Sequence, residues 1–323
     1  MSRILAVGSV AYDSVETPFG ARKEILAGSA TYFSLAASHF VPVAVVAAVG
    51  DDFKASDLDV LASRGVDLSG VQRLAGRTFR WAARYSDDLN DRTTLSTELG
   101  VFAEFKPSIA AAQRQSPYLF LGNIDPDLQR GVFEEMEPPR LVACDTMNFW
   151  IEGRRAALDL TLAVIDLLVI NDAEARLLSG ESNLASAARK ILSMGPKALI
   201  VKRGEYGAAV FGSGFVFFVP ALILEGVVDP TGAGDSFAGG LVGCLAALDR
   251  PGPEIRGKDG GWIEEAALRT AVGAGTVMAS FTVQGFGVEG LLAASAEAIE
   301  KRQGDLARMA GWTPTRLPLR RQR

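Results

Sequence analysis

The run Leu167-Leu168-Val169-Ile170 is continuously apolar, and Asn171-Asp172-Ala173-Glu174 follows it and begins an amphipathic stretch. A short continuous apolar run is typical of a strand buried on both faces, as in a parallel sheet covered by helices. The same alternation of a short apolar run with a longer amphipathic stretch repeats along most of the chain. This repetition predicts an α/β fold with a doubly wound, mainly parallel sheet flanked by helices.

The repetition also predicts where the elements lie. Buried strands are expected at residues 3–8, 43–49, 118–122, 140–144, 166–170 and 198–202. Helices are expected at residues 54–64, 126–136, 152–163, 172–194, 235–248 and 262–282. Residues 26–50 contain no Asp, Glu, Lys or Arg, yet they carry several small polar residues and Pro42. A helix followed by a buried strand therefore fits them better than a membrane span.

Two segments, 12–27 and 73–105, break the repetition. Within the second segment, residues 77–85 and 93–97 have the composition of strands, and residues 86–91 are rich in turn formers. We expect the two segments to form a small β-sheet lid over a ligand at the edge of the main sheet. A homodimer contact through the lid is the alternative role, and both can hold together.

The lid segments are part of one expected α/β domain, residues 1–312. Residues 313–323 contain four arginines and two prolines, and we expect them to form a basic, disordered tail. No signal peptide or membrane span is recognisable, so we expect a cytoplasmic protein without a membrane partner.

Charge and rare residue types exclude several classes of function. The 33 Lys and Arg residues against 38 Asp and Glu give a net charge of −5, and no basic stripe is present, which argues against nucleic-acid binding. Cys144 and Cys244 are the only cysteines, so a disulfide framework is excluded. His39 is the only histidine and lies in an apolar stretch, which argues against a Ser-His-Asp hydrolase and a structural zinc site.

The chemistry is concentrated in the run Asp229-Pro230-Thr231-Gly232-Ala233-Gly234-Asp235-Ser236-Phe237-Ala238-Gly239-Gly240, which joins a loop to a helix. The amides of Gly232, Ala233 and Gly234 are expected at the helix N-terminus, where unpaired N–H groups and the helix dipole bind anions. Asp235, in the first turn, could take a proton from an alcohol that attacks a bound phosphate. A helix cap after a tight turn is its alternative role.

The run from Asp229 to Gly240 resembles the second signature of the ribokinase-like (PfkB) family of sugar and nucleoside kinases. Other matches recur in the family's order along nearly the whole chain. The resemblance implies a ribokinase-like fold, ATP and Mg²⁺ as cofactors, Asp235 as the catalytic base, and the Gly232, Ala233 and Gly234 amides as the anion hole. It also implies Thr231 on the ATP side and Asp229 as a candidate ligand of a monovalent cation, which some relatives hold at these positions.

Three further motifs resemble parts of this family. Gly8-Ser9-Val10-Ala11-Tyr12-Asp13 is similar to the opening motif, which implies that Asp13 binds acceptor hydroxyls. The stretch Asn171 to Glu174 is similar to the Asn-x-x-Glu motif, which implies that Asn171 binds ATP and that Glu174 binds ATP and holds Mg²⁺, directly or through water. An Asn-capped helix start fits the same residues.

The stretch Lys202-Arg203-Gly204-Glu205-Tyr206-Gly207 is similar to the family's nucleotide-side glycine loop. The resemblance implies that Lys202, Gly204 and Gly207 bind ATP. A hairpin turn into residues 208–211 is the alternative.

The first family signature is altered. Where the family usually has Gly-Gly-x-Gly-x-Asn, this chain has Ala27-Gly28-Ser29-Ala30-Thr31-Tyr32, with Tyr32 at the Asn position. A phenol ring cannot reproduce the paired donor and acceptor of an amide, so ribose held in the ribokinase manner is not expected. Gly28, Ser29 and Asn123, which follows the strand 118–122, are the candidate acceptor-binding residues.

These motifs predict an ATP-dependent phosphotransferase that acts on a hydroxyl of a small sugar or polyol. A nucleoside kinase of the same fold is the alternative enzyme. A non-catalytic sugar-sensing module is the alternative from another class, and it would have lost residues of the anion hole or the base. This sequence keeps both the anion-hole residues and the base.

Overall fold

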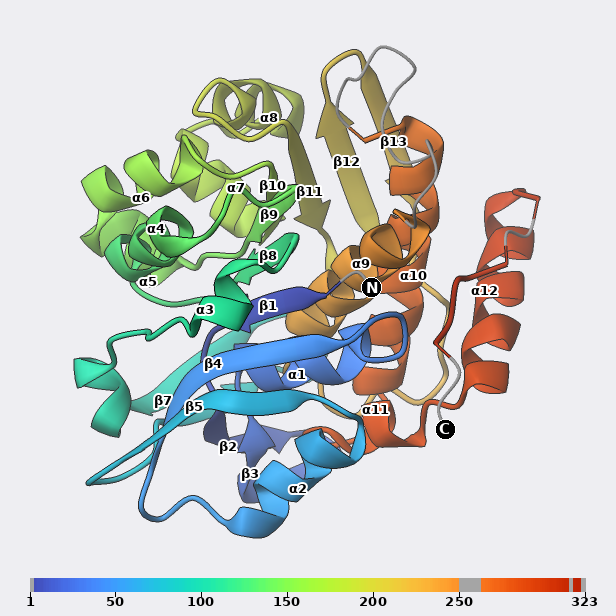
Figure 1. Ribbon diagram of the computed structural model, residues 1–323. Coiled ribbons are helices and arrows are strands. Elements are labelled where there is room, and N and C mark those ends of the chain that lie inside the picture. Colours follow the sequence, from blue (N-terminus) through green and yellow to red (C-terminus); the bar gives the residue numbers. More distant parts are fainter. Residues whose placement is uncertain (1–2, 250–262, 314–315, 321–323) are drawn as a thin grey trace.

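The computed structural model describes residues 3–249, 263–313 and 316–320. Its centre is a nine-stranded sheet of order β13-β12-β11-β10-β9-β8-β1-β4-β5 (Figure 1). Neighbours from β11 to β5 pair in parallel, and β12 and β13 extend the sheet as an antiparallel hairpin. The strands are β1 Ile4–Val7, β4 Val43–Gly50, β5 Asp67–Leu74, β8 Tyr118–Leu121, β9 Leu141–Cys144, β10 Leu167–Asn171, β11 Ala198–Lys202, β12 Ala208–Gly212 and β13 Phe215–Val219.

The apolar runs form strands because both faces of the sheet are buried. In β1, Ile4 and Ala6 belong to the core on one face, and Leu5 and Val7 belong to the core on the other. Successive side chains point in turn into one apolar layer and then the other, so the strand needs no polar positions. The expected doubly wound sheet, with each of its six predicted strands, is confirmed within a residue or two.

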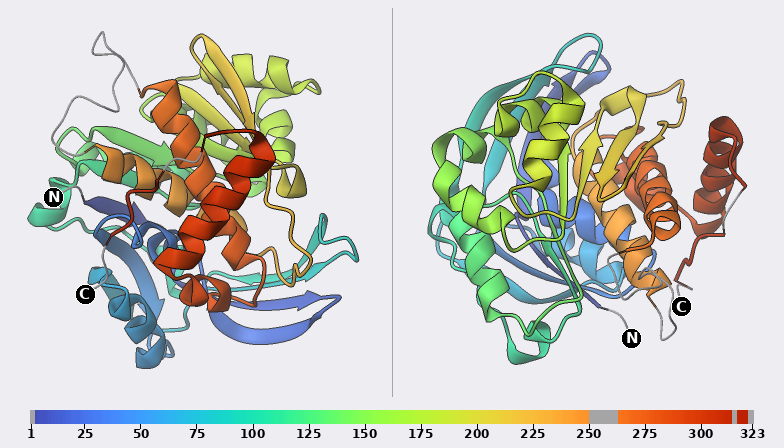
Figure 2. Two further views of the ribbon diagram at one scale, coloured as in Figure 1. Left: turned by 90° about the vertical axis from the view of Figure 1, so that its right-hand side faces the viewer. Right: turned by 90° about the horizontal axis from the view of Figure 1, so that it is seen from above.

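Helices cover both faces (Figure 2). One core packs against α1, α9, α10 and α12, and the other against α4 to α8. The helices are α1 Ser29–Ala37, α2 Ala55–Ser63, α3 Ala111–Arg114, α4 Pro126–Glu135, α5 Asn148–Gly153, α6 Arg155–Leu162, α7 Asp172–Ser179, α8 Leu184–Leu192, α9 Ala233–Leu248, α10 Glu265–Thr282, α11 Glu289–Ala293 and α12 Ala296–Ala310.

The single helix predicted at residues 172–194 is wrong, because two helices, α7 and α8, occupy this stretch. Gly180 ends α7 in the left-handed conformation, with φ 72°. The side chain of Asn183 then accepts hydrogen bonds from the N–H groups of Ala185 and Ser186 and begins α8. A left-handed residue stops a helix even where the apolar spacing continues beyond it.

The predicted lid is confirmed as a separate four-stranded sheet of order β3-β2-β6-β7. Its strands are β2 Ala11–Thr17, β3 Gly20–Ala27, β6 Arg80–Tyr85 and β7 Arg92–Glu98, and it projects from the main domain (Figure 2). One boundary is wrong: Arg73 and Leu74 were expected in the lid, but they pair with β4 as the end of β5 in the central sheet.

Part of the expected tail packs on the domain. Leu317 is 3% exposed and belongs to the core cluster of α10 and α12, and the N–H of Arg320 donates to the carbonyl of His39 at 2.7 Å. The expectation of disorder therefore does not hold for residues 316–320, because an apolar side chain in the basic stretch finds a buried place. No helix in the part of the chain that the structure describes combines the length and apolar character needed to cross a membrane.

Candidate active site

Polar side chains gather at the carboxyl edge of the parallel strands. Asn123 follows β8, Asp145 follows β9, Asn171 ends β10 and Lys202 ends β11. Because these strands are parallel and adjacent, their carboxyl ends lie along one edge. Helix α9 begins at the same edge, because the charges of Asp145 and Lys202 act on Asp235 in its first turn.

The loop before α9 has the geometry of an anion site. Gly232 is the N-cap with φ 75°, and its carbonyl accepts from the N–H of Ser236 at 2.9 Å. The N–H of Ala233 donates to the carbonyl of Pro230 at 3.2 Å, so this amide is used within the loop. The N–H groups of Gly232 and Gly234 have no acceptor among the described residues. The expected three-amide anion hole therefore reduces to these two free amides.

Lys202 adds a positive charge to the anion site. A Cβ atom at Gly234 would lie 2.8 Å from the Lys202 Nζ, so the ammonium group packs directly against the loop. The same Nζ lies 3.7 Å from the Oδ2 of Asp145. Burial lowers the pKa of Lys202, but Asp145 and Glu174 more than offset this effect and raise it. Lys202 therefore stays charged beside the free amides.

Asp235 has the pKa of a general base that works near neutrality. Its carboxyl is half-buried, and burial together with the charge of Asp145 raises its pKa to about 7. Lys202 and Arg92 oppose this rise. A base whose pKa lies near the working pH combines a large deprotonated fraction with a strong drive to take a proton.

Asp13, on lid strand β2, lies close enough to Asp235 for the two charges to interact. Its side chain is 6% exposed, and its pKa is raised well above the usual range by burial and by the charges of Asp229 and Asp235. The structure thus brings the lid carboxylate and the candidate base to one place.

Asp229 and Thr231 link the anion loop to the lid. The Oδ1 of Asp229 accepts from the N–H of Thr231 at 2.9 Å, and its buried Oδ2 accepts no hydrogen bond from any residue that the structure describes. The Oγ1 of Thr231 lies 3.1 Å from the hydroxyl of Tyr85 on β6. In the described ranges, no group of three or more His, Cys, Asp or Glu side chains is arranged to hold a metal ion.

Gly28 and Ser29 have a structural role at the start of α1. The hydroxyl of Ser29 accepts from the N–H of Ser9 at 3.1 Å, and the N–H of Ser29 donates to the Ser9 hydroxyl at 3.0 Å. Gly28 has φ 104°, and a Cβ atom there would lie 2.4 Å from the Ser9 carbonyl oxygen. These two residues hold the loop after β1 in place rather than offering a free group to an acceptor.

Asn123 forms a polar and aromatic corner with α5. The Nε1 of Trp150 donates to the Asn123 Oδ1 at 2.8 Å, and the Asn123 Nδ2 lies 3.0 Å from the Sδ of Met147. The ring of Phe149 meets Trp150 edge-on and is 59% exposed. Sequence reasoning missed these aromatic residues, although Phe149 and Trp150 follow the strand that ends at Cys144 by only five and six residues.

Asn171 and Glu174 form a reciprocal capping box. The Asn171 Oδ1 accepts from the N–H of Glu174 at 2.8 Å, and the N–H of Asn171 donates to the Glu174 Oε2 at 2.8 Å. Burial and the charge of Asp145 raise the pKa of Glu174 to about 6, against the effect of Lys202. The helix-cap alternative is therefore present, and it holds one carboxylate at the sheet edge beside Lys202 and Asp145.

The two glycines after Lys202 differ. Gly207 has φ 83°, and a Cβ atom there would lie 2.0 Å from the Val219 carbonyl oxygen, so it serves the β12–β13 hairpin. Gly204 is exposed, and a Cβ atom there would lie 3.8 Å from the Oδ1 of Asn90, at the tip of the lid. Only Gly204 is therefore open to the region beneath the lid.

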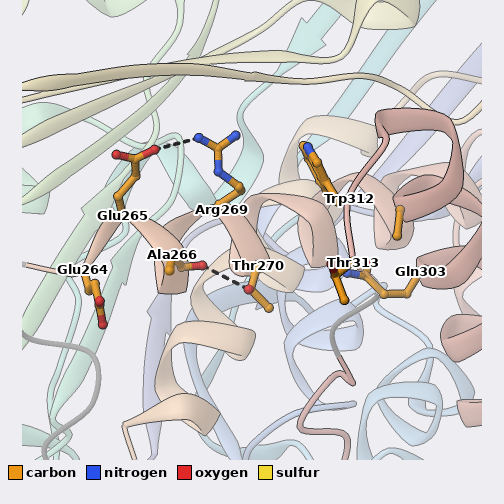
Figure 3. A pocket seen from close by; sticks show the side chains of 9 residues that line it. Glu264, Glu265, Ala266, Arg269, Thr270, Gln303, Trp312 and Thr313 are labelled. Atoms are coloured by element: carbon orange, nitrogen blue, oxygen red, sulfur yellow. Dashed lines mark hydrogen bonds and ion pairs between the residues drawn. The ribbon is translucent and has the colours of Figure 1, made fainter.

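A groove of about 450 Å³ lies elsewhere, between the first turns of α10 and the second half of α12 (Figure 3). The other end of α10 adjoins the anion loop, because the N–H groups of Val228 and Asp229 donate to the carbonyl of Val283. The 18 residues of α10 separate the groove from the loop by about 25 Å. Its lining residues include Glu265, Arg269, Gln303 and Trp312.

Several known structures have the same fold as this protein. The structure of Burkholderia thailandensis nucleoside kinase with inosine superposes with a TM-score of 0.75 at 21% identity, covering 97% of this chain and 99% of that chain. An E. coli chain named ribokinase II, solved with ATP and Mg²⁺, superposes with a TM-score of 0.72 at 21% identity, covering 94% of this chain and 100% of that chain. At these identities the likeness establishes the fold, which is ribokinase-like.

Sequence similarity gives the family. Cytidine kinase from Thermococcus kodakarensis is 30% identical over 262 residues, which cover 78% of this chain and 91% of that protein. The family model for the pfkB family carbohydrate kinases matches residues 20–293. The chain therefore belongs to the pfkB family of carbohydrate kinases and is a phosphotransferase.

Proposed function

We propose that this protein transfers the terminal phosphoryl group of ATP to a hydroxyl of a neutral acceptor, with Asp235 as the general base. The observation that carries the proposal is the position of Asp235, one residue after a free amide of the anion loop and next to the lid carboxylate Asp13. Asp235 takes the acceptor proton, the acceptor oxygen bonds to phosphorus, and the bond from phosphorus to the bridging oxygen of ADP breaks.

The anion loop would hold the transferring group. The N–H groups of Gly232 and Gly234 have no acceptor among the described residues, and the Lys202 ammonium packs against the same loop, so together they can stabilise charge on the phosphoryl oxygens. The Ala233 amide is not part of this set, because Pro230 already accepts from it.

Mg²⁺ fits the residues on the nucleotide side. The charges of Asp145 and Glu174 both raise the pKa of Asp235, so a divalent cation near them relieves repulsion among three carboxylates. Mg²⁺ takes oxygen ligands and often needs only one or two carboxylates, so Glu174 and Asp145 would hold it, and it would neutralise triphosphate charge. Asp229 stays a candidate ligand of a monovalent cation, because no donor in the described ranges reaches its buried Oδ2.

A nucleoside fits the acceptor site better than a free sugar or polyol does. The charges that act on Asp13 are those of other carboxylates, Asp229 and Asp235, which suits an acceptor with hydroxyl groups and no negative charge. The polar and aromatic corner of Asn123, Phe149 and Trp150 offers hydrogen bonds and ring stacking to a nucleobase. The similarity to a cytidine kinase supports the same class.

The proposal is tested by ADP formation with cytidine, inosine, ribose, fructose and glycerol in turn, and mass spectrometry of the product. We expect turnover with a nucleoside and a loss of about 10²–10⁴-fold in kcat for Asp235→Asn. The control is Asp159→Asn, since Asp159 is a surface partner of Arg155. Retained turnover in Asp235→Asn would remove the base assignment, and turnover with sugars alone would remove the nucleoside assignment. A homodimer through the lid stays a prediction, which light scattering tests.

A further inference from the structure

The lid hairpin spans the candidate phosphate site from one side to the other. At the end of β6, the Tyr85 hydroxyl lies 3.1 Å from the Oγ1 of Thr231, which directly precedes Gly232. At the hairpin tip, the Oδ1 of Asn90 lies 3.8 Å from the Cβ position of Gly204, just after Lys202. The chain between these two contacts therefore crosses above the anion loop and the Lys202 ammonium.

Arg92, the first residue of β7, faces this site. It is the cross-strand partner of Tyr85, so the two side chains lie on the same face of the lid. Trp81 and Asp13 are also cross-strand partners, and the Arg92 Cζ lies 5.7 Å from the Trp81 ring centre. Asp13, Trp81, Tyr85 and Arg92 thus form the inner face of the lid.

Arg84, next to Tyr85 in β6, gives the opposite case. Successive residues of a strand point to opposite faces, so Arg84 lies on the outer face. Its Nε donates to the Oε2 of Glu16 at 2.9 Å, and this exposed pair lies on the face opposite Tyr85. The lid therefore carries one inner and one outer arginine close together in the hairpin.

The charge of Arg92 reaches the catalytic carboxylates. It opposes the rise in the pKa of Asp145, Glu174 and Asp235 that burial causes. Arg92 is exposed and forms no ion pair with any other residue that the structure describes. The charges that shift the pKa of Asp13 are those of Asp229 and Asp235, whereas the charge of Arg92 acts on Asp145, Glu174 and Asp235.

We infer that Arg92 binds the terminal phosphate of the bound nucleotide and is a catalytic residue of the phosphoryl transfer, supplied by the lid. This inference rests on the proposed kinase function. A guanidinium group has a planar fork of donors that matches two phosphate oxygens, and charge on those oxygens must be stabilised during transfer. Lys202 acts from the end of β11, beside the anion loop, and Arg92 acts from the lid.

Because Asp13 and Arg92 lie on the same inner face of the lid, acceptor binding is coupled to the position of Arg92. Asp13 would bind the acceptor, and Arg92 is carried by the same sheet, so an ordered lid brings both to the reacting groups at once. If the acceptor orders the lid, ATP bound without an acceptor should be hydrolysed by water only slowly.

Binding measurements test the inference without requiring turnover. By titration calorimetry with Mg²⁺ present, Arg92→Met should bind a non-hydrolysable ATP analogue about 10-fold more weakly than wild type and bind ADP equally well. Arg84→Met, the matched control, should bind both as wild type does. Equal loss of both nucleotides, or loss of neither, overturns the inference.

Kinetics complete the test with the best acceptor. We expect kcat to fall by about 10²–10³-fold in Arg92→Met, with the acceptor KM within about threefold of wild type, and to change less than twofold in Arg84→Met. Guanidinium ion should restore part of the rate to Arg92→Ala. A raised acceptor KM with full kcat would instead place Arg92 on the acceptor. Absence of turnover in wild type with every acceptor would count against the kinase proposal, whereas an active wild type with unaffected Arg92→Met counts only against this inference.

Discussion

The ring of Tyr32 lies against the Cα of Gly232: a Cβ atom at Gly232 would lie 2.4 Å from two ring atoms. Gly232 also has φ 75°, which side chains other than glycine rarely adopt. Tyr32 stands where the family usually has Asn, and it is 1% exposed, with a hydroxyl that has no partner among the described residues. Tyr32 therefore packs against the anion loop. Glycine is required at residue 232 for two independent reasons, the positive φ and the contact with the Tyr32 ring.

Gly232→Ala should weaken both the fold and the anion site. A left-handed alanine costs about 1–2 kcal/mol, and the contact with the Tyr32 ring adds to that cost. We expect the free energy of unfolding to fall by about 2–4 kcal/mol and kcat to fall at least 10-fold, measured by urea unfolding and steady-state kinetics. The control is Gly304→Ala, because Gly304 lies inside α12 with no neighbour near its Cβ position. That variant should be as stable as wild type or more so.

A Tyr32→Ala background separates the two reasons. There the ring contact is gone and only the φ strain remains, so Gly232→Ala should cost less than it does beside Tyr32. An equal cost in both backgrounds would show that the ring does not press on the loop.

The rate of the proposed reaction should rise with pH up to about 7 and then level off. Burial, with the charge of Asp145, raises the pKa of Asp235 to about 7, and only the deprotonated carboxylate can take the acceptor proton. Below that pH, kcat should fall about tenfold per unit, measured between pH 5 and 9. In Arg92→Met the fall should begin at a higher pH, because Arg92 lowers the pKa of Asp235. A flat profile below pH 7 contradicts the assignment of Asp235 as the titrating base.

Tyr85→Phe should loosen the closed lid. The change leaves the buried Thr231 hydroxyl without its partner on the lid, which costs about 1–2 kcal/mol in the closed state only. We expect kcat/KM for the acceptor to fall about 5–30-fold. Tyr12→Phe is the control, because the Tyr12 hydroxyl donates to Asp57 at 2.6 Å, on the side of the lid strand away from the site. It should lower the Tm and leave kcat/KM within about twofold. Equal values of kcat/KM in Tyr85→Phe and Tyr12→Phe would show that the contact of Tyr85 with Thr231 has no kinetic effect.

The central sheet is predictable from the sequence because both faces of its strands are apolar. β1 and β10 read as continuous apolar runs, and no competing structure buries such runs as well. Asp235 and the glycines before it are predictable for a related reason, since a helix start with free amides is a local structure. The use of the Ala233 amide by Pro230 depends on the exact turn, and no residue type indicates it.

The inner face of the lid, and the place of Arg92 on it, are decided by contacts between segments that are distant in the sequence. β2 pairs in parallel with β6, about 70 residues further on, and that pairing decides which side chains share a face with Asp13. Arg92 sits in a strand whose residues are all exposed, so no pattern of burial distinguishes its inner face from its outer face. Gly180 likewise divides one amphipathic stretch into α7 and α8 without interrupting the apolar spacing.

Leu317→Ala tests whether the C-terminal stretch is part of the fold. Leu317 is 3% exposed in the core cluster that includes Leu306, so truncating its side chain should leave a cavity and lower the free energy of unfolding by about 2–3 kcal/mol. Ile223→Ala is the matched control, because Ile223 is 85% exposed and its truncation should have almost no effect. Urea unfolding of both variants makes the comparison. A disordered stretch predicts the same unfolding midpoint for Leu317→Ala, Ile223→Ala and wild type, whereas a packed one lowers the midpoint of Leu317→Ala alone.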